Sequence, residues 1–196
     1  MGLKLIVGLG NPGHTFHETR HNVGFAVIQH LAEQRRIPIE QRAVSLEGRP
    51  AAVYGDYALN AQTVRLVMPL TMMNESGEAL RGVSVPLQDV LVVCDDVNLP
   101  LGAIRLRPDG GAGGHHGLQS CLEVLGTEQL PRLRVGVANG PAPKELTEFV
   151  LGRFTAEERP VIRRAIAEAA EAAEVWVHDG MTIAMNRYNR TQDAPQ

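Results

Sequence analysis

Cysteine, aromatic residues and lysine are all scarce in this 196-residue sequence. Cysteine occurs only at Cys94 and Cys121, aromatics make up 4% of the chain, and Lys4 and Lys144 are its two lysines. Two cysteines exclude a disulfide framework, and so few aromatics imply a mostly aliphatic core. No apolar run approaches the roughly 20 residues of a membrane helix, and no cleavable signal precedes the apolar run that begins at Leu3. We therefore expect a reduced, cytoplasmic protein without a membrane segment.

The charge balance limits the ways in which the protein can bind nucleic acid. The formal net charge of −3 excludes a protein that coats nucleic acid over its whole surface, although it permits a local basic patch. All basic residues other than the two lysines are arginines, whose planar guanidinium group suits phosphate. A genome base composition that favours arginine codons explains the same bias equally well.

Apolar runs of strand length alternate with segments of helical periodicity. We expect strands at residues 3–10, 51–57, 63–68, 90–93, 103–107 and 133–137. We expect helices at residues 21–36, 75–83, 116–125 and 155–177, the last with a Thr155–Glu158 capping box. This alternation predicts a single α/β domain over residues 1–190, with a mixed, mostly parallel sheet flanked by helices. Residues 191–196 are predicted to form a flexible tail.

Polar residues follow three of the predicted strands. Asn11 comes after the first strand, Met73 and Asn74 after the strand that ends near Met68, and Asp95 after the next. Chemistry in α/β sheets gathers at the carboxyl ends of strands. These residues are therefore the first candidates for a site.

Two short motifs suggest cofactor or metal chemistry, but their context disfavours it. Residues 8–13 match G-x-G-x-x-G, yet no acidic residue ends a second strand about 20 residues on, as a dinucleotide site requires. Residues 17–21 match H-E-x-x-H, which binds zinc when it lies in a helix. Here it follows a Gly-Asn-Pro-Gly turn, although His14 could supply a third ligand. We predict neither a cofactor nor a metal.

Seven blocks of sequence together resemble one enzyme family. They are V-G-L-G-N-P-G at 7–13, T-R-H-N at 19–22, M-M-N-E-S-G at 72–77, D-D-V-N-L-P-L-G at 95–102, G-G-A-G-G-H at 110–115, R-L-R-V-G-V at 132–137 and F-V-L-G-R-F at 149–154. Each block alone is modest. Their order and their spread over nearly the whole chain resemble the bacterial-type peptidyl-tRNA hydrolases.

The resemblance implies a function and a set of residue roles. It implies a monomeric, cofactor-free esterase that cuts the ester bond between peptide and tRNA. His21 would be the general base and Asp95 the group that orients it. Asn11 would hold the substrate near the scissile bond, and Asn74 would position the peptide and stabilise the tetrahedral intermediate. Met73 would support the site by packing.

These roles are chemically coherent without the family name. An ordinary histidine has a pKa of about 6.5. As a general base it can accelerate a reaction by roughly 10²- to 10⁴-fold. A carboxylate on its other nitrogen fixes the tautomer, and an amide donor to the oxyanion is worth about 3 kcal/mol. Without a convincing serine or cysteine nucleophile, direct attack by water is the simplest mechanism. Plain structural roles remain open for three of these residues. Asp95 could cap the following turn, and its neighbour Asp96 is the other candidate for the orienting carboxylate. Asn11 could be a turn residue, and Asn74 could be a helix N-cap.

A tRNA substrate would need basic groups near the site. The candidates are Arg105, Arg107, Arg132, Arg134 and Lys144. The resemblance marks the basic groups of the 105–107 and 132–134 regions as a phosphate clamp. The alternative for the first two is that they only keep a strand face soluble. Gly114 and His115 are further candidate binding residues. Gly114 ends a glycine-rich segment, residues 110–114, that we expect to gate the peptide channel, and His115 follows it.

Two residues depart from the family pattern. Phe16 stands where tyrosine is usual, and His116 where an asparagine helps to hold water and substrate. Asp96 and Asn98 replace Glu and Asp, with little expected effect. We predict that activity survives with an altered pH profile. Two other functions remain: a non-catalytic RNA-binding relative, and an esterase or amidase that uses the same water–histidine chemistry on a small substrate.

Overall fold

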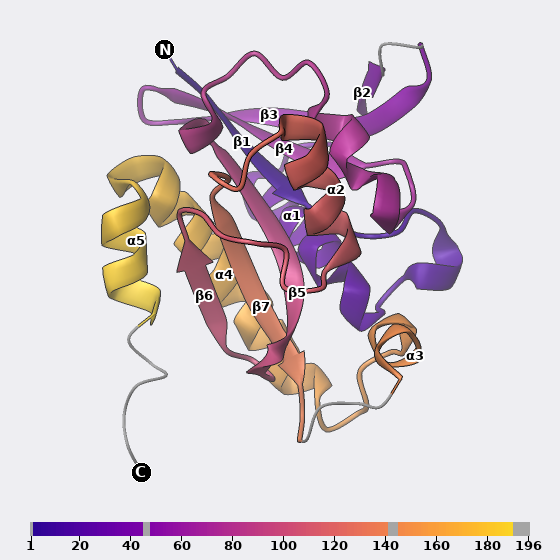
Figure 1. Ribbon diagram of the computed structural model, residues 1–196. Coiled ribbons are helices and arrows are strands. Elements are labelled where there is room, and N and C mark those ends of the chain that lie inside the picture. Colours follow the sequence, from indigo (N-terminus) through magenta and orange to yellow (C-terminus); the bar gives the residue numbers. More distant parts are fainter. Residues whose placement is uncertain (1, 45–47, 141–144, 190–196) are drawn as a thin grey trace.

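A seven-stranded sheet organises the computed structural model, which describes residues 2–44, 48–140 and 145–189 (Figure 1). Its strand order is β2-β3-β4-β1-β5-β7-β6. The strands are β1 (Gly2–Gly8), β2 (Gln41–Val44), β3 (Pro50–Leu59), β4 (Gln62–Pro69), β5 (Val90–Pro100), β6 (Ile104–Arg107) and β7 (Arg132–Ala138).

Parallel pairing is confined to the four central strands, β4, β1, β5 and β7. The outer pairs β2–β3, β3–β4 and β6–β7 are antiparallel. The expected mixed sheet is therefore confirmed, although parallel pairing does not dominate it. Val7 of β1 lies beside Val92 of β5, so Asn11 and Asp95 come to the same edge of the sheet.

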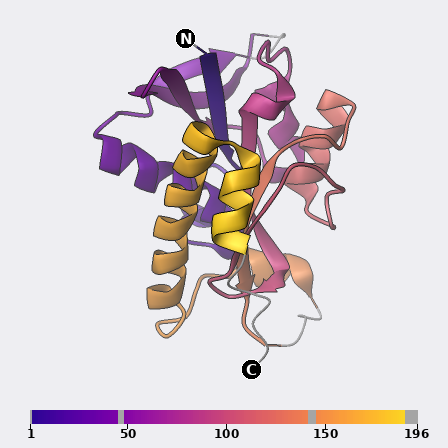
Figure 2. The ribbon, with the colours of Figure 1, turned by 90° about the vertical axis from the view of Figure 1, so that its left-hand side faces the viewer.

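Helices cover both faces of the sheet. They are the 3₁₀ helices η1 (His14–Phe16), η2 (Arg20–Asn22), η3 (Met73–Leu80) and η4 (Leu87–Asp89), and the α-helices α1 (Val23–Arg35), α2 (His116–Leu125), α3 (Leu146–Leu151), α4 (Arg159–Asp179) and α5 (Met181–Tyr188). One face packs against α1 and α4, and α5 lies beside α4 (Figure 2). The other face packs against α2 and η3.

The core is mostly aliphatic, as the low aromatic content predicts. A row of buried alanines on α4, including Ala165, Ala169 and Ala173, lets this helix approach the sheet closely. Trp176 is the largest fully buried side chain of the described residues. The second core cluster, between the sheet and α2, is built from leucine and valine with Cys94 and Cys121.

Several predicted boundaries differ from the observed ones. The predicted helix at 75–83 is a 3₁₀ helix that starts at Met73, and Met72 occupies its N-cap instead of Asn74. The capping box forms, with Thr155 N donating to Glu158 Oε2 at 2.8 Å, but regular α-helix begins only at Arg159. Within the described residues no helix is long and apolar enough to span a membrane. The predicted tail and Lys144 lie outside the described residues.

Candidate active site

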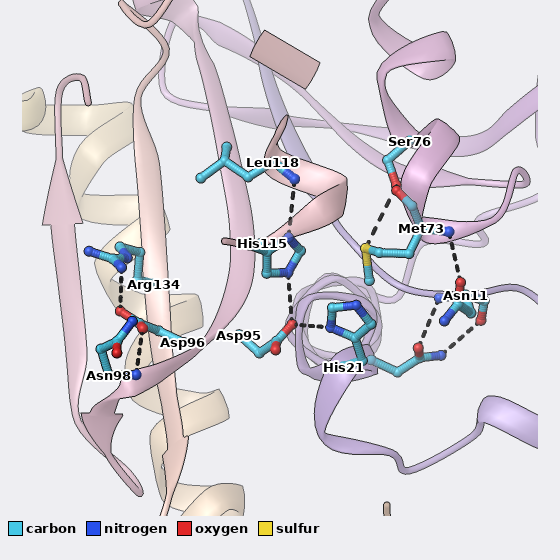
Figure 3. A network of polar contacts seen from close by, with 11 residues as sticks. Asn11, His21, Met73, Ser76, Asp95, Asp96, Asn98, His115, Leu118 and Arg134 are labelled. Atoms are coloured by element: carbon cyan, nitrogen blue, oxygen red, sulfur yellow. Dashed lines mark hydrogen bonds and ion pairs between the residues drawn. The ribbon is translucent and has the colours of Figure 1, made fainter. Parts of the chain in front are cut away.

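His21 and Asp95 meet at the carboxyl edge of the sheet. His21 lies in η2, just before α1, and Asp95 lies on β5. Nδ1 of His21 lies 2.8 Å from Oδ1 of Asp95 (Figure 3). Among the described residues, Nε2 of His21 has no protein partner, and His21 lines a cavity of about 410 Å³. A histidine oriented in this way can accept a proton from a water molecule in the cavity.

A second histidine, His115, contacts the same carboxylate oxygen. Its Nε2 lies 2.9 Å from Asp95 Oδ1, and its Nδ1 accepts a hydrogen bond from the backbone N–H of Leu118 at 3.1 Å. Since Nδ1 is an acceptor, the ring proton must reside on Nε2 and point at Asp95. His115 therefore caps α2 and donates to Asp95 in its neutral form.

Asp95 is 4% exposed, and two opposing effects act on its carboxyl group. Burial alone would raise its pKa, but the His115 imidazole, and then that of His21, point N–H groups at the carboxylate and together hold its pKa well below the usual range. Asp95 is thus a carboxylate that only accepts hydrogen bonds. Both imidazoles must donate to it, which fixes Nε2 as the basic nitrogen of neutral His21.

The neighbouring Asp96 has a different partner. Its Oδ2 lies 2.8 Å from Nη2 of Arg134, and its Oδ1 accepts from the backbone N–H of Asn98. The choice between the two carboxylates that the sequence left open is therefore resolved geometrically: Asp95 faces His21, and Asp96 faces the arginine on β7.

Asn11 is held by three hydrogen bonds. Its backbone N–H and carbonyl pair with the side chain of Asn22, and its Oδ1 accepts from the backbone N–H of Met73 at 2.7 Å. Because Oδ1 must face that donor, the orientation of the carboxamide is set. Asn11 lines the cavity, and its Nδ2 has no partner among the described residues. This amide is available to donate to a substrate oxygen.

Met73 and Asn74 bring η3 to the same cavity. Met73 is buried, and its sulfur would lie only 2.3 Å from a Cβ atom at position 117. Gly117 of α2 therefore permits this close approach, which a larger residue would push apart. Asn74 is exposed and lines the cavity, so its amide can reach a ligand there. The opposite wall is apolar and comes from α3, with Leu146, Val150 and Leu151.

The strand arginines form cross-strand pairs. Arg105 lies opposite Arg134, and Arg107 lies opposite Arg132, in the β6–β7 register. Arg107 is exposed, and Arg105 and Arg134 are half-buried. Arg132, in contrast, is 2% exposed and donates to the carbonyls of Leu130, Gly110, Gly111 and Glu128. Its expected contact with phosphate is inconsistent with this arrangement, because the guanidinium N–H groups already point at backbone oxygens.

The two departures from the family pattern lie in different places. His116 is exposed at the start of α2 and lines the cavity. Phe16 is half-buried in η1, where its carbonyl accepts a hydrogen bond from Thr19 Oγ1, and it does not line the cavity.

The sequence marked His115 only as a binding residue. Its bond to Asp95 was missed because no spacing rule relates a loop histidine to a strand carboxylate 20 residues away.

The H-E-x-x-H stretch does not adopt the geometry of a zinc motif. Glu18 has φ 61° and His17 is extended, so the stretch is not a helix. Ligand atoms of His21, Asp95 and His115 do lie within 4.8 Å of one another. However, Leu118 N–H occupies Nδ1 of His115 and keeps a proton on Nε2, the atom that a metal would need. The donor set fits a proton-bearing network better than a metal site.

These features define a class of protein: a hydrolase with a mixed α/β sheet, whose histidine–carboxylate pair faces a cavity flanked by amides, with arginines on adjacent strands. A profile of the family described as peptidyl-tRNA hydrolase matches residues 5–196. The chain belongs to this family, which confirms the resemblance.

Relatives match along nearly the whole chain. Peptidyl-tRNA hydrolase of Syntrophomonas wolfei is 43% identical over 95% of this chain and 100% of its own length. That of Synechococcus sp. strain JA-3-3Ab is 45% identical over 96% of this chain and 84% of its own. A crystal structure of peptidyl-tRNA hydrolase from Acinetobacter baumannii has a TM-score of 0.84 and 30% identity, covering 96% of this chain and 95% of that one.

Proposed function

We propose that this chain hydrolyses the ester bond between peptide and tRNA in peptidyl-tRNA and so frees tRNA for reuse in translation. Family membership over residues 5–196 supports the reaction. The observation that carries the proposal is the 2.8 Å contact between His21 Nδ1 and Asp95 Oδ1, beside a cavity that Nε2 can reach. A water molecule placed there is the nucleophile.

The reaction follows from the donors and acceptors around the cavity. Nε2 of His21 takes a proton as water attacks the ester carbonyl, and Asp95 stabilises the imidazolium that forms. Nδ2 of Asn11 and the amide of Asn74 donate to the oxyanion of the tetrahedral intermediate. When the intermediate collapses, the C–O bond to the ribose breaks. The imidazolium then returns its proton to the leaving ribose oxygen.

His115 contributes to this step through Asp95. By donating to the same oxygen as His21, it holds the carboxylate in place and charged. The apolar wall from α3 suits side chains of the peptide, and Leu146 and Leu151 in that wall are 51% and 38% exposed. The proposed peptide thus lies between α3 and the amides of Asn11 and Asn74.

The proposed tRNA contacts lie on β6 and β7. Arg105, Arg107 and Arg134 supply positive charge next to the cavity, and Arg134 also lines it. Lys144 remains part of the proposal, although it lies outside the described residues. Phosphate contacts position a nucleic acid without reading its sequence, which suits an enzyme that accepts many tRNAs. We propose that the enzyme acts as a cytoplasmic monomer.

The direct test is release of an N-blocked amino acid from tRNA by the wild type and by His21→Ala. The wild type should cleave the blocked substrate and leave free aminoacyl-tRNA intact. His21→Ala should lose roughly 10²- to 10⁴-fold in rate while remaining folded. His17→Ala, an exposed histidine four residues away, is the matched control and should keep full activity.

Two results would favour the alternatives. A wild type that binds tRNA but releases nothing would make the chain a non-catalytic RNA-binding relative. Cleavage that bare tRNA does not inhibit, together with unchanged KM in Arg105→Ala and Arg107→Ala, would point to a small-molecule esterase instead. In that case the phosphate clamp should be abandoned.

A further inference from the structure

Arg132 is a buried cation surrounded by backbone carbonyls. It is the first residue of β7 and 2% exposed. Nε donates to Leu130 O at 2.7 Å, and Nη1 donates to Gly110 O at 2.6 Å and Gly111 O at 3.2 Å. Nη2 makes a longer contact of 3.4 Å with Glu128 O. Every nitrogen of the guanidinium group thus faces a main-chain oxygen.

This arrangement is unusual because, among the described residues, the nearest carboxylates, those of Asp109 and Glu128, act on the guanidinium group only from beyond ion-pair distance. Within residues 2–44, 48–140 and 145–189, no carboxylate forms an ion pair with Arg132, whereas Arg134 two residues on pairs with Asp96. Burial correspondingly lowers the pKa of Arg132. Burying a cation costs free energy, which its hydrogen bonds must offset. The carbonyls that surround Arg132 indicate what the buried charge does.

Those carbonyls come from two segments that it joins. Leu130 and Glu128 lie in the connection between α2 and β7, and Gly110 and Gly111 start the glycine-rich loop between β6 and α2. The backbone N–H of Gly110 also donates to Glu128 O at 3.0 Å. One guanidinium group therefore fixes the beginning of the loop to the beginning of β7.

The far end of this loop is His115. Between Gly111 and His115 the chain passes through Gly113 and Gly114, with φ of 60° and 84°, a conformation that favours glycine. His115 then donates to Asp95 and accepts from Leu118. The loop is short, and the backbone N–H of His115 donates to Ala112 O at 3.1 Å, so the position of His115 depends on where the loop begins.

We propose that Arg132 is a positioning residue of the hydrolase: it holds the glycine-rich loop so that His115 supports Asp95, and it does not bind tRNA phosphate. This proposal rests on the proposed function for its kinetic consequence. It separates Arg132 from Arg107, which lies directly opposite it on β6 and is exposed. The two arginines of one cross-strand pair thus have different tasks.

The first experiment measures kcat, KM and the salt dependence of kcat/KM for Arg132→Ala and Arg107→Ala. Arg132→Ala should lower kcat by about 10- to 100-fold, the scale of an ångström-sized misplacement, with an unchanged salt slope. Arg107→Ala should keep kcat, raise KM and reduce the slope by about one. Arg65→Ala on β4, which breaks an ion pair with Asp56 of β3, controls for losing an arginine elsewhere.

Rescue and spectroscopy separate positioning from a general loss of structure. Ethylguanidinium ions should restore part of the activity of Arg132→Ala but none of that of His21→Ala. Arg132→Lys should be intermediate, because an ammonium group cannot reach both pairs of carbonyls. Nitrogen NMR of the imidazoles should show His115 protonated at Nε2 in the wild type and a mixture of tautomers in Arg132→Lys.

Other outcomes would overturn the proposal. A raised KM and a shallower salt slope with unchanged kcat in Arg132→Ala would make Arg132 a phosphate ligand. Unchanged kinetics together with an unchanged His115 spectrum would show that Arg132 has no role in positioning the loop. If Arg132→Ala does not fold, Arg132→Lys provides both readouts. If the wild type does not cleave peptidyl-tRNA, the proposed function fails, while the His115 spectrum still decides whether Arg132 positions the loop.

Discussion

His21 and His115 donate to the same carboxylate oxygen, Oδ1 of Asp95, with their ring centroids 4.9 Å apart. The two rings differ in what their second nitrogen meets. Nδ1 of His115 is occupied by the N–H of Leu118, whereas Nε2 of His21 faces the cavity. The pair therefore divides into a structural imidazole and a reactive one, and Asp95 links them.

Replacing Asp95 with asparagine should nearly abolish turnover. Asparagine is neutral, so it cannot stabilise the imidazolium of His21 as a carboxylate does. Its NH2 group can also turn towards Nδ1 of His21, which would move the imidazole proton to Nε2, the wrong tautomer for a base. We expect kcat to fall by about 10⁴-fold. Single-turnover cleavage of N-blocked aminoacyl-tRNA measures the loss. Asp96→Asn, next along the strand but bonded to Arg134, should lose far less. Equal losses in the two variants would argue against Asp95 as the orienting group.

The same carboxylate should make stability sensitive to acid. Its folded pKa lies below the usual value, so its contribution is fully present above about pH 4 and is lost as the pH falls through the folded pKa. Urea unfolding of the wild type and Asp95→Asn between pH 7 and pH 2 measures this. The difference in unfolding free energy between them should shrink as the pH is lowered. A difference that stays constant over this range would contradict the depressed pKa.

The fold could be predicted from the sequence where the pattern is local. The apolar runs of β1, β4, β5 and β7 are buried strands, and their alternation with helices specifies a mixed sheet. The carboxyl-end rule then brings Asn11 and Asp95 together without any structure. Boundaries that depend on tertiary contacts were less accurate. β5 continues to Pro100 because β7 pairs with it, which no local pattern reveals.

Side-chain roles that depend on packing could not be predicted. Arg132 and Arg134 are two residues apart on one strand, and by alternation they share a face. Only the structure shows that Arg132 lies beneath the glycine-rich loop and meets carbonyls, while Arg134 meets Asp96. In the same way, His115 and His116 are neighbours in the sequence, but only His115 contacts Asp95.

His116 provides a test of the pH profile. It is exposed at the cavity and replaces the asparagine usual in the family. We expect the pH profile of kcat/KM to differ between the wild type and His116→Asn. Activity should survive the substitution because asparagine can also donate and accept. Identical pH profiles in the two proteins would exclude a part for His116 in the reaction.

The two cysteines should be inert in the folded protein and destabilising at high pH. Burial raises the pKa of the Cys121 thiol to about 12, and burial together with the charge of Asp95 raises that of Cys94 well above its usual value. Both thiols therefore stabilise the fold below about pH 9, and this contribution is lost as the pH rises towards the folded pKa. Native protein should react with neither iodoacetamide nor a disulfide reagent at pH 8, whereas urea-unfolded protein should react at two sites. Rapid labelling of the native state would contradict the observed burial.

Arg20 and Glu158 form a buried ion pair that joins the His21 segment to the start of α4. Their side chains are 8% and 6% exposed, with Nη2 and Oε2 2.6 Å apart, and Nη1 of Arg20 donates to Arg153 O. Glu158→Gln leaves the guanidinium buried without a counter-ion and should destabilise the protein by about 3–5 kcal/mol. Arg20→Met combined with Glu158→Leu removes both charges, so the double variant should be more stable than Glu158→Gln.

Urea unfolding at pH 7 measures these differences, and the unchanged m-value expected for all variants serves as the control for two-state behaviour. Since Arg20 N also donates to Gly152 O at 3.0 Å, the backbone beside His21 retains one anchor in the double variant. Its kcat should therefore fall less than that of Asp95→Asn. If Glu158→Gln is as stable as the wild type, the ion pair contributes nothing, and the link between α4 and the catalytic segment depends on the backbone contacts alone.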